Sequence, residues 1–154
     1  MTAVIQRVKN ANVAVEGEIK GKCNQGLMIL LGVFSHDTDF DAEILASKTA
    51  SLRIFIDEND KMNKSVTDIG GEALVVSQFT LCADTKKGNR PSFSGAMNPE
   101  KANELYEKYC DLLKNNGIKS VEKGVFGADM QVSLVNDGPV TIILDTTIWR
   151  KNGN

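Results

Sequence analysis

The chain has 154 residues and a net charge of -2, with 42% hydrophobic and 25% charged residues. That composition is ordinary for a globular protein, so we expect one domain over residues 1–154 that folds without a disulfide or a structural metal. No apolar run reaches the roughly 20 residues that a membrane span requires. A nearly neutral charge argues against a protein that coats nucleic acid over its whole surface.

The first eight residues lack the charged start, long apolar middle and cleavage site of a secretory signal, and we therefore expect a cytoplasmic protein. Cys23, Cys82 and Cys110 are odd in number and widely spaced. This spacing favours buried, reduced thiols over a disulfide or zinc framework.

Taken in chain order, the first elements are predicted to be strands. Residues 4–15 are rich in Val and Ile, and Glu16 and Gly17 separate them from residues 19–22, a pattern typical of a hairpin. The continuous apolar run at residues 26–33 predicts a central strand that is buried on both faces.

A helix is expected over residues 39–51, because Thr38 and Asp41 have the spacing of an N-terminal capping box and apolar residues recur at helical spacing. Strands are expected at residues 52–56 and 74–76, joined by a polar connection over residues 57–71.

The clearest helix begins with Asn98 as N-cap and Pro99 in its first turn, and Asn116-Gly117 predicts its end. Alternating residues at 130–135 and 140–145 predict two antiparallel strands around a turn at residues 136–139. Two helices and at least seven strands indicate a mixed α/β fold: a single compact domain of packed, largely antiparallel, barrel-like sheets covered by two main helices.

The usual catalytic apparatus is missing from the sequence. His36 is the only histidine, and its polar loop favours a solvated surface residue over a general base. There is no nucleophile elbow, phosphate loop or dinucleotide motif, and no cluster has metal-ligand spacing. We therefore expect neither a metal nor a cofactor.

Two polar segments interrupt apolar strands, Ser77-Gln78-Phe79-Thr80-Leu81 and Asn136-Asp137-Gly138-Pro139-Val140-Thr141. Polar groups at strand ends often form sites. Pattern alone favours a plainer interpretation, since Asp-Gly is common hairpin chemistry and alternate strand residues face solvent.

Further strings accompany these two segments: Val4-Ile5-Gln6-Arg7-Val8, Gly70-Gly71-Glu72, Lys86-Lys87-Gly88-Asn89-Arg90-Pro91-Ser92-Phe93 and Phe126-Gly127-Ala128-Asp129-Met130. Together, and in this order over most of the chain, they resemble the D-aminoacyl-tRNA deacylase family. The resemblance implies an enzyme that hydrolyses the ester of D-aminoacyl-tRNA at the tRNA 3' end.

The resemblance also implies which residues act. Ser77, Gln78, Phe79 and Thr80 would form the catalytic segment, with backbone N–H groups near Phe79 and Thr80 stabilising the oxyanion. No nearby histidine or lysine in the sequence offers a base for Thr80, so we expect water to attack, and the resemblance implies that the 2'-hydroxyl of the terminal ribose assists it.

Chiral selection is assigned to the Gly138-Pro139 pair. The resemblance implies a homodimer in which this pair, with a cis peptide bond, enters the partner's pocket, while Arg7 braces it. Its backbone would receive the α-amino group and leave no room for an L side chain, so that D-amino acids and glycine are accepted.

The remaining assignments concern binding. The substrate pocket is expected to include Phe93, Ala96, Phe126, Met130 and Asn136, although apolar residues of this kind are individually more often core. The basic residues Lys86, Lys87 and Arg90 are expected to contact the tRNA backbone, or else to form an ordinary solvated loop. The competing hypotheses are a noncatalytic RNA-binding or interaction module and a general small-ester hydrolase.

Overall fold

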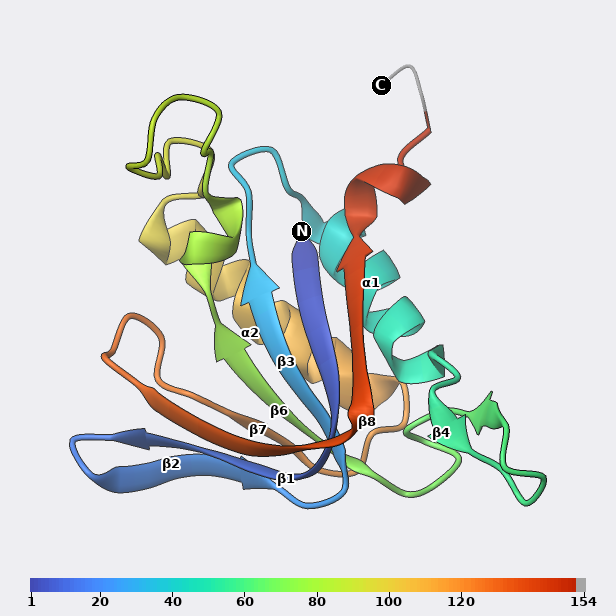
Figure 1. Cartoon of the computed structure of the whole chain (residues 1–154). Coiled ribbons are helices and arrows are strands. Elements are labelled where there is room, and N and C mark those ends of the chain that lie inside the picture. The colour runs from blue at the N-terminus through green and yellow to red at the C-terminus, as the bar shows by residue number, and fades with distance from the viewer. Residues whose placement is uncertain (152–154) are drawn as a thin grey trace.

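The sheet is built around one long strand, β1 (Thr2–Val15), in a computed structural model that describes residues 1–151 (Figure 1). β1 pairs antiparallel with β2 (Glu18–Cys23), β3 (Gly26–Gly32) and β8 (Gln131–Asp145). Its first half lies between β3 and β8, and its second half lies between β2 and β8. The hairpin and the strand at 26–33 are confirmed.

Two parallel strands extend the sheet beyond β3. β6 (Glu72–Ser77) pairs parallel with β3, and β7 (Val121–Lys123) pairs parallel with β6, which gives the order β2-β1-β3-β6-β7. β2 also contacts β7, so the bent sheet is nearly closed into the predicted barrel-like form.

Helices α1 (Asp39–Ser51) and α2 (Pro99–Asn115) lie against each other and cover the same face of the sheet (Figure 1). Thr38 and Asp41 form the predicted capping box, and the Asn98 side chain accepts a hydrogen bond from the Lys101 N–H at 3.1 Å. No helix within residues 1–151 is long and apolar enough to cross a membrane.

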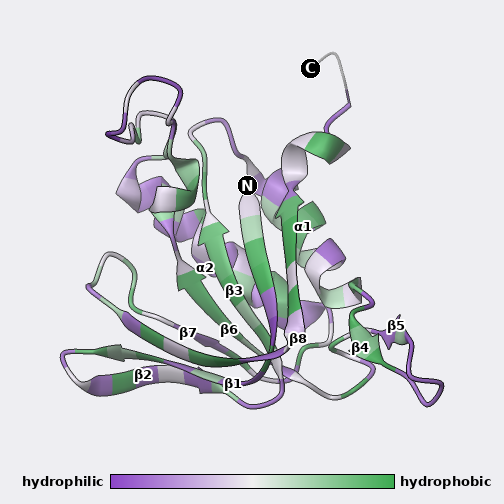
Figure 2. Cartoon of the chain, in the orientation of Figure 1, coloured by the Kyte–Doolittle hydropathy of each residue, from purple (hydrophilic) through white to green (hydrophobic). Residues whose placement is uncertain are grey.

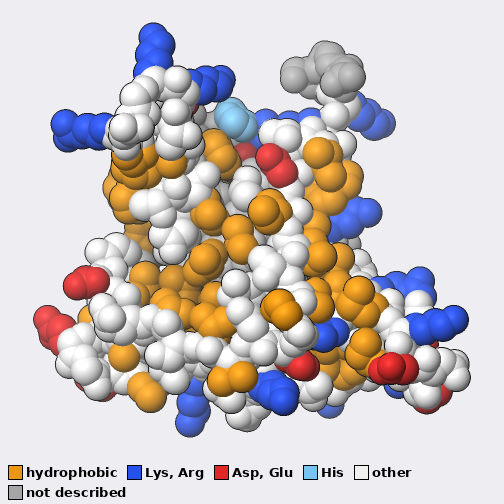
Figure 3. All heavy atoms as spheres, in the orientation of Figure 1, with side chains coloured by type: hydrophobic (Ala, Val, Ile, Leu, Met, Phe, Trp, Pro, Cys, Tyr) orange, Lys and Arg blue, Asp and Glu red, His pale blue; other side chains and the backbone are white. Residues whose placement is uncertain are grey.

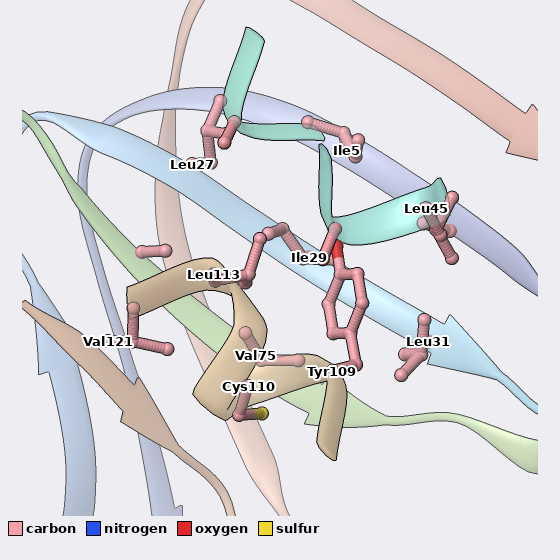
Figure 4. Close-up of a cluster of buried hydrophobic side chains, with 14 of the residues drawn as sticks. Ile5, Leu27, Ile29, Leu31, Leu45, Val75, Tyr109, Cys110, Leu113 and Val121 are labelled. Carbon is pink, nitrogen blue, oxygen red and sulfur yellow. The ribbon is translucent and has the colours of Figure 1, made fainter. Parts of the chain in front are cut away.

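The main core lies between this helical layer and the sheet. Tyr109 and Leu113 of α2 meet Ile29 of β3 and Val75 of β6, and all four are fully buried (Figure 4). The apolar residues of the central strands stand out in the hydropathy view (Figure 2). The core therefore fixes α2 against the strand that leads to the polar segment at Ser77.

The three cysteines are free and buried, as the sequence predicts. Burial raises the pKa of Cys23 to about 11 and that of Cys110 to about 12. These thiols therefore stay protonated at neutral pH and act as small apolar side chains.

The prediction for residues 52–71 is wrong in part. The strand here is short, β4 (Phe55–Ile56), and the connection contains its partner, β5 (Met62–Lys64). Leu52 instead forms the C-cap of α1. β4 is short because its partner, β5, is equally short. The other β-rich residues in this stretch have no strand beside them in the described chain.

The predicted hairpin at residues 136–139 is also wrong. β8 is one strand that follows β1 along its whole length, so its two halves run in the same direction. The register passes from Val8 opposite Asn136 to Gln6 opposite Thr141, which leaves residues 137–140 opposite Arg7 alone. The long partner strand outweighs the local Asp-Gly turn signal, and the extra residues bulge out of the ladder.

A buried charged cluster ties the chain ends to α1. The Met1 ammonium group lies 2.6 Å from Asp37, and Arg150 lies 2.7 Å from Asp37 and 2.6 Å from Asp41. Thr146, which begins the short 3-10 helix η2 (Thr146–Trp149), donates to Asp41 at 2.5 Å. Burial of Asp41 opposes ionisation, but hydrogen bonds from Thr146, Thr38 and Arg150 outweigh it and lower its pKa to about 2.

This cluster predicts a loss of stability in acid. A carboxylate whose pKa falls on folding stabilises the fold above its unfolded pKa, near 4, and loses that contribution as the pH falls towards 2. We expect the free energy of unfolding of the protein to fall between pH 5 and pH 2 by about 2 kcal/mol more than that of Asp41→Asn. Urea unfolding across this range measures the difference, and parallel curves would contradict it.

Candidate functional site

A cavity of about 660 Å³ opens where β6 ends. Its walls come from the end of β6, the start of α2 and the connection between β7 and β8, three segments that are far apart in the sequence. The sequence-predicted residues that line it are Ser77, Gln78, Phe79, Phe93, Ala96, Phe126 and Met130. The fold therefore brings most of the predicted catalytic segment and pocket together.

The polar segment differs from the predicted strand. β6 ends at Ser77, and Phe79–Cys82 form a 3-10 helix, η1. The Gln78 N–H still donates to the Leu31 carbonyl at 2.8 Å, which anchors this bend to β3. The first N–H groups of a helix have no acceptor within it, so those of Phe79 and Thr80 are suited to bind a developing oxyanion.

The Thr80 hydroxyl accepts a hydrogen bond from Gln78 Nε2 at 2.5 Å. Thr80 is exposed and does not line the cavity. His36 is 53% exposed, stacks on Phe34 and lies 3.8 Å from Asp37, outside the cavity. No lining residue of the cavity, all of which belong to the described chain, is a histidine or lysine that would take a proton from Thr80.

The rest of the cavity is mostly apolar. Phe79 is 58% exposed and meets the Phe93 ring edge-on, with 5.1 Å between ring centroids. Figure 3 shows hydrophobic side chains gathered at the centre of this face. Such a surface suits a flat or apolar group such as a base or an aromatic side chain.

One charged residue lines the cavity, and it was not among the predicted site residues. Asp129 belongs to the Phe-Gly-Ala-Asp-Met string, which the sequence singled out without a role for its carboxylate. A carboxylate repels phosphate but accepts hydrogen bonds from amino and hydroxyl groups. Further lining residues that sequence reasoning missed are the apolar Leu31, Val33, Val76, Met97, Ala102 and Val132, whose spacing resembles that of ordinary core.

The bulge of β8 at residues 137–140, called the Gly138-Pro139 turn from here on, is held by Arg7, which is only 8% exposed. Arg7 donates to the Asp137 carbonyl at 2.8 Å and to the Ile54 carbonyl at 2.7 Å. The Gly138-Pro139 peptide is cis, as the resemblance implies. The bracing contact predicted for Arg7 is thus present in the fold.

The turn is exposed and does not line the cavity of its own chain. Asn136, assigned to the substrate pocket from the sequence, lies at the start of this turn and is likewise exposed. A single chain therefore carries the predicted catalytic segment and the predicted selecting turn at separate places.

The basic residues Lys86, Lys87 and Arg90 are exposed in the loop at the upper left of Figure 1, where Figure 3 shows Lys and Arg side chains. The loop is closed by backbone hydrogen bonds between Asp84 and Ser92, at 2.7 and 2.9 Å. The loop connects η1 to Phe93, and both of these segments contribute residues to the cavity. Within residues 1–151, no group of three or more His, Cys, Asp or Glu side chains is placed to hold a metal ion.

The site thus combines N–H donors at the start of η1 with a mostly apolar cavity, an arrangement that can bind a carbonyl oxygen together with a flat or apolar group. The family model for D-Tyr-tRNA(Tyr) deacylase matches residues 4–145. The chain belongs to this family, which confirms the resemblance.

The chain is similar to D-aminoacyl-tRNA deacylases over its full length or nearly so. The D-aminoacyl-tRNA deacylase of Roseiflexus castenholzii is 56% identical over 154 residues, which cover 100% of this chain and 98% of the relative. That of Thermosipho africanus is 58% identical over 146 residues, covering 95% and 97%.

Two solved structures have the same fold. The c-Myc DNA Unwinding Element Binding Protein has a TM-score of 0.89 at 43% identity, with 94% of this chain and 98% of that chain covered. A probable eukaryotic D-amino acid tRNA deacylase has a TM-score of 0.79 at 16% identity, covering 94% and 99%, and supports the fold alone.

Proposed function

We propose that the protein is a carboxylic-ester hydrolase that cleaves D-aminoacyl-tRNA into free tRNA and a D-amino acid, and that it does so in the cytoplasm. The observation that carries this proposal is the cavity beside η1. The free N–H groups of Phe79 and Thr80, at the start of η1, can bind the ester oxyanion. Family membership and relatives more than 50% identical support the same activity.

Selection of the D form is assigned to the Gly138-Pro139 turn. We propose that its backbone carbonyls receive the substrate α-amino group and that the turn occupies the space an L side chain would need. Arg7 is anchored by its hydrogen bond to the Ile54 carbonyl and holds the turn by its hydrogen bond to the Asp137 carbonyl. The backbone wall is therefore rigid. Exclusion of this kind does not reject glycine, and mischarged glycyl-tRNA is therefore a second proposed substrate.

A second copy of the chain is proposed to supply the turn. The turn is exposed and outside the cavity of its own chain, so the site is incomplete without a partner. Val135 and Ile143, on either side of the turn in β8, are 48% and 68% exposed. Apolar side chains exposed along a strand are suited to an isologous interface, in which each protomer gives its turn to the other.

Hydrolysis of two matched substrates tests the function. The protein is expected to release tyrosine from D-tyrosyl-tRNA and to leave L-tyrosyl-tRNA intact. A noncatalytic RNA-binding module would release neither amino acid. A general esterase would instead hydrolyse D-tyrosine ethyl ester as readily as the tRNA ester, which would contradict the proposal.

The basic loop predicts a salt-dependent contact with tRNA. Replacing Lys86 and Lys87 with Ala should weaken binding of uncharged tRNA and reduce the slope of log affinity against log salt concentration by about 1.4, because each phosphate contact to a single strand contributes about 0.7. Lys114→Ala with Lys119→Ala removes two exposed cations elsewhere and should leave the slope unchanged. Equal slopes for both double variants would exclude the loop from the interface.

A further inference from the structure

One buried carbonyl joins three parts of the site. The Val75 carbonyl, in β6 two residues before Ser77, accepts a hydrogen bond from the Tyr106 hydroxyl at 2.7 Å and another from the Gly124 N–H at 3.1 Å. Tyr106 belongs to α2 and is only 1% exposed. The strand end, the helix and the connection after β7 therefore meet at this point.

The ring of Tyr106 makes a second contact with the cavity wall. It packs against Phe126, with ring centroids 6.0 Å apart and planes inclined at 51°. Phe126 lines the cavity from the connection that begins at Gly124. Tyr106 thus touches both the strand that leads to the polar segment and a residue of the cavity wall.

The hydroxyl is a fixed donor. Burial raises the pKa of Tyr106 far above its usual range, so it stays neutral and keeps its proton throughout the working range of pH. Removing the donor leaves the Val75 carbonyl with one fewer partner in a dry environment, where an unmet hydrogen bond is costly.

We propose that Tyr106 is a positioning residue for hydrolysis, an inference that rests on the proposed function. Its hydroxyl binds the Val75 carbonyl near the end of β6, while its ring packs on Phe126 in the connection after β7. Tyr106 thereby fixes the position of the strand end relative to residues 124–130 of that connection. The N–H groups of Phe79 and Thr80 follow that strand end, so their aim at the ester depends on it. A small displacement of such donors slows the chemical step more than it weakens binding.

The chain offers a matched control on the same helix. Tyr109 is fully buried (Figure 4), and its hydroxyl is hydrogen-bonded to the Thr49 hydroxyl of α1 at 2.9 Å. Neither residue lines the cavity. Tyr109→Phe and Tyr106→Phe each remove one buried hydroxyl and one hydrogen bond. Both should lower the melting temperature by roughly 2–4 °C, since each loses a comparable interaction.

Kinetics on D-tyrosyl-tRNA separate the two variants. Tyr106→Phe should lower kcat by about tenfold with little change in KM, because donors are misplaced while the apolar pocket remains. Tyr109→Phe should keep the kcat of the unaltered protein. An unchanged kcat for Tyr106→Phe, or an equal loss in both variants, would overturn the proposal.

Amide hydrogen exchange tests the positioning without relying on activity. Tyr106→Phe should speed exchange at the hydrogen-bonded amides of Gln78, Leu81, Gly124 and Ala128, and Tyr109→Phe should not. If the unaltered protein released no D-tyrosine, the proposed function would fail, and the exchange pattern would still decide whether Tyr106 holds these segments together. Identical exchange in the two variants would refute that role.

Discussion

A D-aminoacyl-tRNA whose terminal adenosine lacks the 2'-hydroxyl is expected to be hydrolysed at least about 100-fold more slowly than the ordinary substrate, the usual scale of general acid–base assistance. The reason is that Thr80 has no hydrogen bond to a histidine, lysine or carboxylate in the described chain; the one carboxylate that lines the cavity is that of Asp129. Thr80 accepts a hydrogen bond from Gln78, and no histidine or lysine lines the cavity within the described chain. The adjacent ribose hydroxyl is therefore the group best placed to assist water.

The companion variant is Thr80→Ala. It should retain much of its activity on the ordinary substrate, because the N–H of residue 80 remains when the side chain is lost. Single-turnover release of the labelled D-amino acid measures both effects. Loss of activity in Thr80→Ala together with full activity on the 2'-deoxy substrate would make Thr80 the nucleophile and defeat this mechanism.

The second large effect concerns Gly138. Its φ is +134°, and a Cβ added there would lie 2.9 Å from Arg7 Nη2 and 3.1 Å from the Val140 nitrogen. Gly138→Ala must therefore displace either the turn or the arginine that holds it. We expect kcat/KM for D-tyrosyl-tRNA to fall at least about tenfold and the ratio of D to L hydrolysis to shrink.

A control separates this effect from backbone strain. Gly17, in the β1–β2 turn, has φ +80°, and an added Cβ would meet nothing within 4 Å. Gly17→Ala brings a similar unfavourable backbone conformation at a distance from the site, and its D to L ratio should match that of the unaltered protein. If Gly138→Ala kept both its rate and its ratio, the turn would have no part in selection.

Local sequence signals correctly predicted the elements that depend on neighbouring residues, such as helix caps, or on a strong hydrophobic pattern. The caps at Thr38 and Asn98, and the continuous apolar run of β3, gave correct boundaries within a residue or two. β8 was misjudged because its path is set by pairing with β1, a partner more than 100 residues away. Asp-Gly is turn chemistry in isolation, but the bulge opposite Arg7 depends on that distant strand.

The site residues divide in the same way, into those that sequence signals singled out and those that they missed. Ser77, Gln78 and Phe79 could be singled out because polar residues interrupt an apolar strand, and the family resemblance supplied their role. Asp129 and Tyr106 carried no such signal, because an acidic loop residue and a helix tyrosine are common in any fold. Their significance comes from the cavity and from the Val75 carbonyl, which only the folded chain reveals.

Mixed dimers test most directly whether the site is shared between two copies of the chain. Ala96→Trp should fill the cavity and Gly138→Ala should disable the turn, so that each variant alone has little activity on D-tyrosyl-tRNA. In a mixed dimer, one of the two sites joins an open cavity to an intact turn.

After equimolar protomers are exchanged, half of the dimers are mixed, and about one quarter of all sites should be active. We expect the activity to recover to about that fraction of the unaltered rate. No recovery, with exchange of protomers confirmed by differently tagged chains, would contradict a site completed by the partner's Gly138-Pro139 turn.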